Sequence, residues 1–272
     1  MRSAKPRPTW WAPSGFAAIP TAALDRTIGG VFFGGERIGE TARFGLVGGY
    51  SSSAFDVDAR NSSGTADSFH IAAFGGTTLA AAGFRGGVAL TQSEIDTSRF
   101  VDFGTFSDRP EARYDATTAQ VFGEAGYRVD VSRGMIEPFG GLAYVNLDTD
   151  GFTEEGGAAA LHGGDDSIDL LYSTIGLRAA APLPLGPLEA RARGSLAWRH
   201  AFDDDAPTAT LAFAASDPFT VTSVPAAEDV LSLDVAIEIA LATGALLELT
   251  YDGQIGSGLS DHSLRSNLSW RF

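Results

Sequence analysis

The feature that most constrains this chain is an alternation of apolar and polar side chains, with a period of two residues, that recurs along most of its length. In residues 231–241 the odd positions are Leu, Leu, Val, Ile, Ile and Leu, and the even positions are Ser, Asp, Ala, Glu and Ala. Successive side chains of an extended strand point to opposite sides, so this segment has one apolar and one polar face. A helix would scatter the same charges around its circumference. The segment is therefore predicted to be an amphipathic β-strand.

Ten further segments repeat this alternation, which predicts eleven strands in all. Their residue ranges are 29–37, 42–58, 66–78, 82–96, 112–130, 135–148, 167–181, 188–202, 230–242, 245–256 and 262–272. Short connections such as Thr243-Gly244 alternate with long ones such as residues 148–166 and 202–229. Short periplasmic turns and longer outer loops are typical of outer-membrane β-barrels, which usually have an even number of strands. We therefore predict an all-β fold, a transmembrane antiparallel β-barrel of 12 strands, with the twelfth strand near residues 9–19.

Composition excludes several other classes of protein. The 272 residues contain no cysteine, so neither disulfides nor thiolate metal sites are available. No run of 18 apolar residues occurs, which excludes an ordinary transmembrane helix. The formal net charge of −15 disfavours a nucleic-acid partner, because the phosphate backbone would be repelled. We expect no cofactor and no metal.

The charged residues of the predicted strands fall mostly on the polar face, which a barrel turns toward its lumen. A charge on the lipid face would cost about 2–4 kcal/mol near the membrane midplane. The resulting pore-lining prediction comprises Arg43, Arg85, Glu124, Arg128, Glu137, Arg178, Glu189, Arg191, Arg193, Arg199, Asp234, Glu238, Glu248, Asp252, Arg265 and Arg271. Two interpretations stay open. The charges hold and hydrate a threaded segment, or they pair with one another only to stabilise the lumen.

The last predicted strand ends the chain on an aromatic residue. Leu264, Leu268, Trp270 and Phe272 alternate with polar residues up to the final position. In a soluble protein this pattern would expose apolar surface to water. It resembles the C-terminal signal read by the barrel-assembly machinery of Gram-negative bacteria, which assigns Leu268, Trp270 and Phe272 to a barrel-assembly signal.

Several short motifs, in their order and spacing, resemble the C-terminal translocator domain of autotransporters, the type V secretion barrel. The matching stretches are Asp25-Arg26 with Gly29-Gly30, Phe44-Gly45 to Gly49-Tyr50, Phe122-Gly123-Glu124 with Gly126-Tyr127-Arg128, Glu137-Pro138-Phe139, Gly176-Leu177-Arg178, Trp198-Arg199-His200, Tyr251-Asp252-Gly253 and Trp270-Arg271-Phe272. The resemblance covers residues 25–272. It implies a twelve-stranded barrel with a helix in its pore, which anchors an N-terminal passenger domain and exports it to the cell surface.

Several expectations follow from this resemblance. Residues 1–9 would be a remnant of the linker and pore helix, and residues 10–272 the barrel. The expected partners are outer-membrane lipid with lipopolysaccharide, the barrel-assembly machinery and an own or cognate passenger, and we expect a monomer in the Gram-negative outer membrane. The alternative is a free-standing porin-like channel, because no passenger is present in this sequence.

Signals for catalysis are weak in this sequence. The histidines His70, His162, His200 and His262 are scattered, and there is no G-x-S-x-G nucleophile elbow. We therefore predict that the chain is not an enzyme. Asp203-Asp204-Asp205 could bind a divalent cation at the outer rim, but a solvated acidic loop is the expected interpretation.

Overall fold

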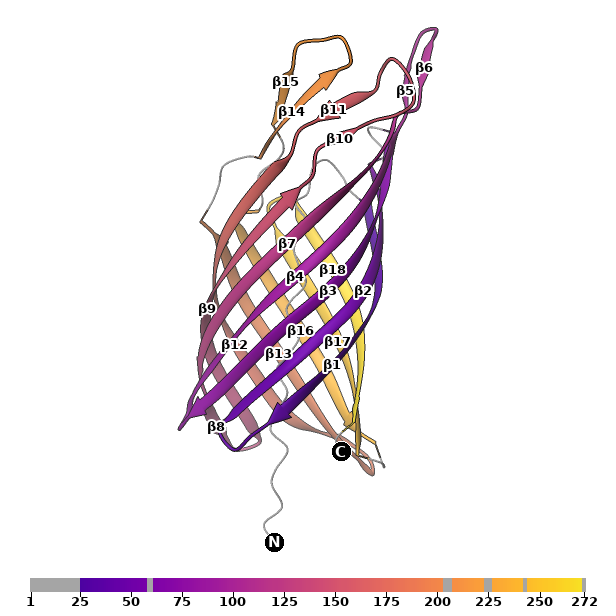
Figure 1. Ribbon diagram of the computed structural model, residues 1–272. Helices are drawn as coiled ribbons and strands as arrows, with labels where there is room; N and C mark the ends of the chain where they lie inside the picture. Colours follow the sequence, from indigo (N-terminus) through magenta and orange to yellow (C-terminus); the bar gives the residue numbers. More distant parts are fainter. Residues whose placement is uncertain (1–24, 58–60, 203–206, 223–226, 242–243, 271–272) are drawn as a thin grey trace.

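In the described part of the chain the long strands form one antiparallel sheet that curls into a barrel (Figure 1). The computed structural model describes residues 25–57, 61–202, 207–222, 227–241 and 244–270. Along the sheet the long strands are β1 (Asp25–Ile38), β2 (Ala42–Val57), β3 (Ser62–Leu79), β4 (Ala82–Arg99), β7 (Glu111–Tyr127), β9 (Gly134–Thr149), β12 (Asp166–Leu185), β13 (Leu188–Ala201), β16 (Asp229–Ala240), β17 (Ala245–Gly256) and β18 (Leu259–Trp270). The short strand β8 (Val129–Val131) also pairs with β9. Each long strand is a sequence neighbour of the strand it pairs with, so the fold is a meander.

The alternating segments of the sequence coincide with the eleven long strands, and the antiparallel barrel fold is confirmed. The largest differences are at strand ends, as in β3 and β4, which extend further toward the long connections than predicted. The twelfth strand predicted near residues 9–19 and the proposed remnant at residues 1–9 lie outside the described residues. Within the described ranges no helix is long and apolar enough to cross a membrane.

The connections differ in length between the two ends of the barrel, as the sequence predicts. At one end the turns are short, and Gly186 and Gly244 adopt positive φ angles of 61° and 76° in two of them. Glycine has no Cβ to oppose this conformation, so tight turns are possible there. We call the opposite end, which carries the long connections, the outer end.

The outer end carries strands of its own (Figure 1). β5 (Val101–Phe103) pairs with β6 (Phe106–Asp108), and β10 (Phe152–Thr153), β11 (Leu161–Gly163), β14 (Thr208–Phe213) and β15 (Phe219–Thr222) form a four-stranded sheet. Within this sheet β14 and β15 pair antiparallel, with Thr208 opposite Thr222 and Leu211 opposite Phe219. Arg99 at the end of β4 holds the long connection between β9 and β12 in place. Its Nε and Nη2 donate to the two Glu154 carboxylate oxygens at 2.7 and 2.6 Å.

The strand path ends at β1 on one side and at β18 on the other. Because the path contains an odd number of antiparallel strands, β1 and β18 run in the same direction, both from the outer end toward the short turns. Arg26 of β1 and Asp261 of β18 form an ion pair between these two strands, with Nη2 and Oδ2 2.7 Å apart.

The distribution of apolar residues is inverted relative to a soluble protein. Large side chains lie on the outer surface, where Phe33 is 76% and Leu264 79% exposed. The buried residues include the charged Glu137, Arg193 and Glu238, each less than 10% exposed. A barrel surrounded by lipid places apolar residues outside and polar residues inside, so this arrangement is the one expected of a membrane-spanning barrel.

Candidate functional site

The cross-strand register places most of the predicted pore-lining residues on the inner face of the barrel. Arg85 lies directly opposite Glu124, Glu137 opposite Arg178, and Arg191 opposite Glu238. Residues directly opposite each other on neighbouring strands point to the same side of a sheet. The charges therefore form a polar inner wall, which is the candidate functional site.

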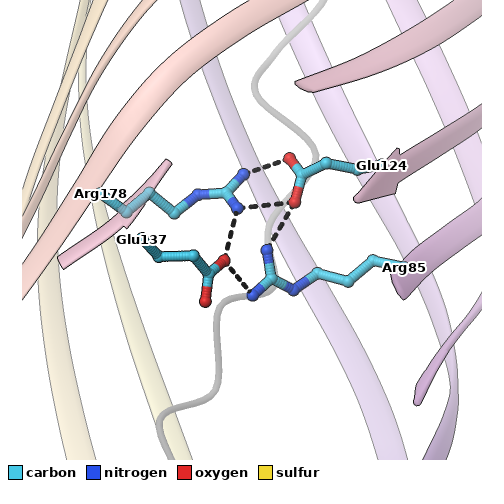
Figure 2. A network of polar contacts seen from close by, with 4 residues as sticks. All are labelled: Arg85, Glu124, Glu137 and Arg178. Atoms are coloured by element: carbon cyan, nitrogen blue, oxygen red, sulfur yellow. Dashed lines mark hydrogen bonds and ion pairs between the residues drawn. The ribbon is translucent and has the colours of Figure 1, made fainter. Parts of the chain in front are cut away.

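Four of these residues form one connected cluster, shown in Figure 2: Arg85 of β4, Glu124 of β7, Glu137 of β9 and Arg178 of β12. Arg85 Nη1 and Nη2 lie 2.5 Å from Glu124 Oε1 and 2.5 Å from Glu137 Oε1, respectively. Arg178 donates to both oxygens of Glu124, with Nη1 2.6 Å from Oε1, and its Nη1 lies 3.3 Å from Glu137 Oε1. Each guanidinium thus bridges both carboxylates, which Arg can do because its donors form a planar fork. We call this group the four-residue cluster.

The four-residue cluster is largely shielded from solvent and carries no net formal charge. Its side chains are between 6% and 17% exposed. The Arg178 guanidinium also lies over the Phe139 ring, 3.6 Å from the ring centroid, which adds a cation–π contact. Two glycines leave room for the glutamate side chains: a Cβ on Gly126 would meet Glu137 Oε1 at 2.8 Å, and a Cβ on Gly141 would meet Glu124 Cβ at 3.3 Å. The local sequence therefore supplies both the charges and the space for them.

A second group of charges lies on β13, β16 and β17. Arg193 Nη2 is 2.5 Å from Glu248 Oε2, and Arg193 Nε is 3.3 Å from Glu238 Oε1. All three side chains are at most 12% exposed. Arg193 thus joins two carboxylates that lie directly opposite each other in the sheet, which would repel one another without a cation between them.

A third group occupies the last strands. Arg265 of β18 makes a bidentate pair with Asp252, with Nη2–Oδ1 and Nε–Oδ2 distances of 2.5 and 3.0 Å. Asp234 lies directly opposite Asp252 on β16. Further toward the outer end, Arg199 Nη2 donates to Gln254 at 2.8 Å, and its guanidinium is 5.3 Å from the Tyr172 ring centroid.

The remaining residues of the pore-lining prediction have different surroundings. Arg43 is in register with Gly76, which is in register with Arg85, so Arg43 shares their face. Arg128 is exposed near the short turns and pairs with Asp130 at 2.8 Å, away from the four-residue cluster. Glu189 is exposed beside the β12–β13 turn. Arg271 lies outside the described residues.

The outward positions of the proposed assembly signal are partly described. Leu268 and Trp270 lie on the outer face of β18 and are 47% and 59% exposed. Phe272 lies outside the described residues. Their role in assembly stays a prediction.

Sequence reasoning missed a hydrogen-bonded network of histidine, serine and threonine on the inner wall. His70 of β3 lies between two hydroxyls, with Nε2 2.8 Å from Ser51 Oγ and Nδ1 2.9 Å from Thr91 Oγ1. The Phe32 ring lies 5.2 Å from the His70 ring. The signal was present in the alternation, because His70 has the phase of the polar Ser68, and the adjacent apolar Ile71 has the opposite phase.

Aromatic residues on the outer face hydrogen-bond to acidic residues nearer the outer end. Tyr50 donates to Asp67 at 2.6 Å, Tyr144 to Asp169 at 2.5 Å, and Trp198 Nε1 to Asp229 at 2.8 Å. Each acceptor lies on the neighbouring strand. Aromatic residues with an apolar body and a polar tip are enriched at membrane–water interfaces, so these pairs indicate the level of that boundary.

Comparison with known proteins agrees with this architecture. Residues 19–252 match the family model described as "Autotransporter beta-domain". The chain is 35% identical over 231 residues to an "Extracellular serine protease" of Serratia marcescens, a match that covers 85% of this chain and 22% of that protein. The chain therefore spans about a fifth of the length of this relative.

Solved structures of autotransporter domains share the fold. The translocator domain of the autotransporter NalP from Neisseria meningitidis aligns with a TM-score of 0.73 at 17% identity, covering 92% of this chain and 82% of that one. The β domain of the Bordetella autotransporter BrkA aligns with a TM-score of 0.62 at 16% identity, covering 93% and 94%. Autotransporter translocator domains are outer-membrane β-barrels of Gram-negative bacteria, which gives this chain its location. By its match to the family model over most of its length, the chain belongs to the autotransporter β-domain family.

Proposed function

We propose that this barrel anchors an N-terminal passenger polypeptide in the outer membrane and exports it to the cell surface. The observation that carries the proposal is the charged inner wall of this autotransporter-family barrel. Eight neighbouring strands, from β4 to β18 along the sheet, contribute charged residues that form ion pairs on the lumen side. A polypeptide in transit carries polar groups that cannot be left without partners in lipid. A hydrated polar lumen gives these groups hydrogen-bond partners and so removes the free-energy cost of leaving them unpaired.

The pairing of the charges favours passage over tight binding. In the four-residue cluster two arginines balance two glutamates, and both carboxylates accept from both guanidiniums. A wall whose charges are already paired offers little net attraction to either an acidic or a basic segment. Exported segments of varied sequence can then move along it without being retained.

The passenger is inferred from the family and from the relatives. The chain matches only 22% of the length of a relative named an extracellular serine protease, and we infer that a passenger domain is linked ahead of the barrel in the complete protein. We infer that the barrel itself transports and does not catalyse. In its inner-wall network, His70 contacts the hydroxyls of Ser51 and Thr91, whereas a serine triad would require a carboxylate on the second ring nitrogen.

The other proposed partners follow from the surfaces. The exposed outward aromatic and aliphatic residues suit contact with outer-membrane lipid and lipopolysaccharide, and the last strand suits recognition by the barrel-assembly machinery. We propose a monomer, because each barrel would enclose its own lumen.

A surface-display experiment tests the proposal. A signal peptide, an epitope-tagged reporter and a helical linker of about 20 residues, long enough to span the membrane at 1.5 Å per residue, are fused ahead of Met1. External protease should then remove the epitope from intact cells. The matched control carries the same fusion without residues 259–272, so that β18 is absent. A folded, inserted barrel that leaves its reporter in the periplasm would contradict the proposal.

Planar-bilayer conductance separates translocation from the porin-like alternative. A translocator without its passenger should give a narrow and unstable pore. A steady, solute-selective conductance, together with failure of display, would favour a free-standing channel.

A further inference from the structure

A cluster of metal-ligating side chains lies outside the lumen, on the outward face at the outer end. It consists of His200 near the end of β13, Asp229 at the start of β16 and Glu228 immediately before it. The register places His200 directly opposite Asp229, and the backbone N–H of Ala201 donates to the Glu228 carbonyl oxygen at 2.8 Å. The sheet therefore fixes the backbones of all three residues. We call this group the rim cluster.

The ligand atoms of the rim cluster are spaced as a metal site requires. His200 Nδ1 lies 3.1 Å from Asp229 Oδ1 and 4.0 Å from Glu228 Oε1, and all three ligand atoms lie within 4.8 Å of one another. Around a tetrahedral zinc ion with bonds of about 2.0–2.1 Å, neighbouring ligand atoms are separated by about 3.3 Å. The histidine–aspartate distance is close to this value. The Glu228 side chain is 60% exposed, so it can rotate by the remaining distance.

The surroundings orient the ligands before any ion arrives. Trp198 Nε1 donates to Asp229 Oδ1 at 2.8 Å, which fixes the carboxylate that faces His200. The His200 ring is held between two aromatic rings, with centroid distances of 5.6 Å to Trp198 and 5.2 Å to Phe202. Partners of this kind, which hold ligating side chains in place, usually raise metal affinity.

We propose that His200, Glu228 and Asp229 bind a divalent transition-metal ion, with Zn²⁺ as the representative ion. One imidazole nitrogen with two carboxylates suits zinc, nickel or copper better than calcium or magnesium, which prefer sites made only of oxygen ligands. Three protein ligands leave at least one coordination position open. The site is separate from the inner wall and does not depend on export.

His262 provides a matched comparison within the same protein. It also lies on the outward side of its strand near the outer end, and its ring contacts an aromatic residue, Tyr251. Its described hydrogen-bond partners are hydroxyls, with Tyr251 at 2.7 Å and Ser260 at 3.3 Å. The adjacent Asp261 is engaged with Arg26. His262 is thus a histidine in a position similar to that of His200, but it lacks the two carboxylates that His200 has beside it in the rim cluster.

Metal titration of the full chain, refolded in detergent micelles, tests the proposal. Isothermal titration with ZnCl₂ should give one site per chain, and Co²⁺ should give the visible absorption of a four- or five-coordinate centre. H200Q should weaken Zn²⁺ binding by at least about tenfold, since even loss of an outer-shell partner costs about 10–100-fold. E228Q should weaken binding as well. Because the Glu228 side chain is exposed, the E228Q variant should fold like the unaltered chain. Heat-modifiable gel mobility checks that each variant is folded.

Two controls make the result decisive. H262Q should bind Zn²⁺ like the unaltered chain. So should the variant D203N/D204N/D205N, which removes three carboxylates at positions outside the described residues. The proposal is overturned if the unaltered chain binds no Zn²⁺, if H200Q and E228Q bind it normally, or if either control abolishes binding.

Discussion

Arg26 in the first described strand and Asp261 in the last form an ion pair, with 2.7 Å between Nη2 and Oδ2. The two residues are separated by 235 positions in sequence and lie on the inner side of the two strands that end the sheet path. Their side chains are 25% and 30% exposed. The pair is therefore a contact that fixes how the two ends of the sheet approach each other at the outer end.

We predict that this pair contributes measurably to the stability of the barrel. In a double-mutant cycle of R26Q and D261N, the coupling free energy should be about 0.5–1 kcal/mol, the upper part of the range for partly exposed ion pairs. Urea unfolding in detergent micelles, followed by tryptophan fluorescence, provides the free energies. The comparison pair is Arg113–Asp96, whose side chains are 67% and 42% exposed and whose coupling should be smaller. Equal coupling in the two cycles would contradict this role of the Arg26–Asp261 pair.

Removing one member of the four-residue cluster should be costly. R178M leaves Glu124 and Glu137 with one guanidinium between them, and loss of one partner from a buried ionic group typically costs about 3–5 kcal/mol. The double variant R178M/E137Q restores the charge balance and should lose less than the sum of the two single variants. The midpoint of urea unfolding gives the comparison. Strict additivity would mean that the cluster is not one connected unit.

Glycine positions on two adjacent strands should differ sharply in their tolerance of a methyl group. In G141A the new Cβ would meet the backbone oxygen of Gly123 at 2.8 Å, and overpacking of this kind costs about 1–3 kcal/mol. A Cβ on Gly123 itself meets nothing within 4 Å, so G123A is the matched control and should fold with unchanged stability. Equal unfolding midpoints for G141A and G123A would show that the sheet can relax around the clash.

The strands and their faces were predictable from the sequence because alternation is a local property. The sequence pattern alone assigned Arg85 and Glu124 to the polar face of their strands, and the structure places them opposite each other. Which charges meet was not predictable, because it depends on the register of strands far apart in sequence. Arg128 has the phase of a pore-lining residue but lies near the short turns, where its exposed guanidinium pairs with Asp130. Depth along a strand is set by the whole barrel and not by local alternation.

The contacts across greater sequence distances had no local signal. Arg26 lies three residues before the predicted strand at residues 29–37, and Asp261 lies one residue before the predicted strand at residues 262–272. The cation–π contact of Arg178 with Phe139 depends on the pairing of β9 with β12. The closing strand predicted near residues 9–19 stays a prediction, and the parallel direction of β1 and β18 is the reason to expect one further strand.

Trp270 should matter for assembly in cells more than for stability in detergent. It is the last described residue and is 59% exposed on the outer face of β18. W270A should reduce the amount of barrel inserted in the outer membrane several-fold, because the recognition surface of the last strand is altered. W198A, which removes an exposed outward tryptophan from an internal strand, is the control. Equal insertion of W270A and W198A would remove Trp270 from the assembly signal.

The central claim is that an exported polypeptide passes along the charged inner wall, and cysteine cross-linking tests it most directly. The chain contains no cysteine, so single cysteines can be introduced at Ser195, on the inner face of β13, and at Ser173, on the outward face of β12. A passenger that carries one cysteine and a folded domain that stalls its export is fused ahead of Met1. We predict a disulfide-linked product between the stalled passenger and S195C, and none with S173C. Cross-linking to S173C alone, or to neither position while the passenger still reaches the cell surface, would contradict export through this lumen.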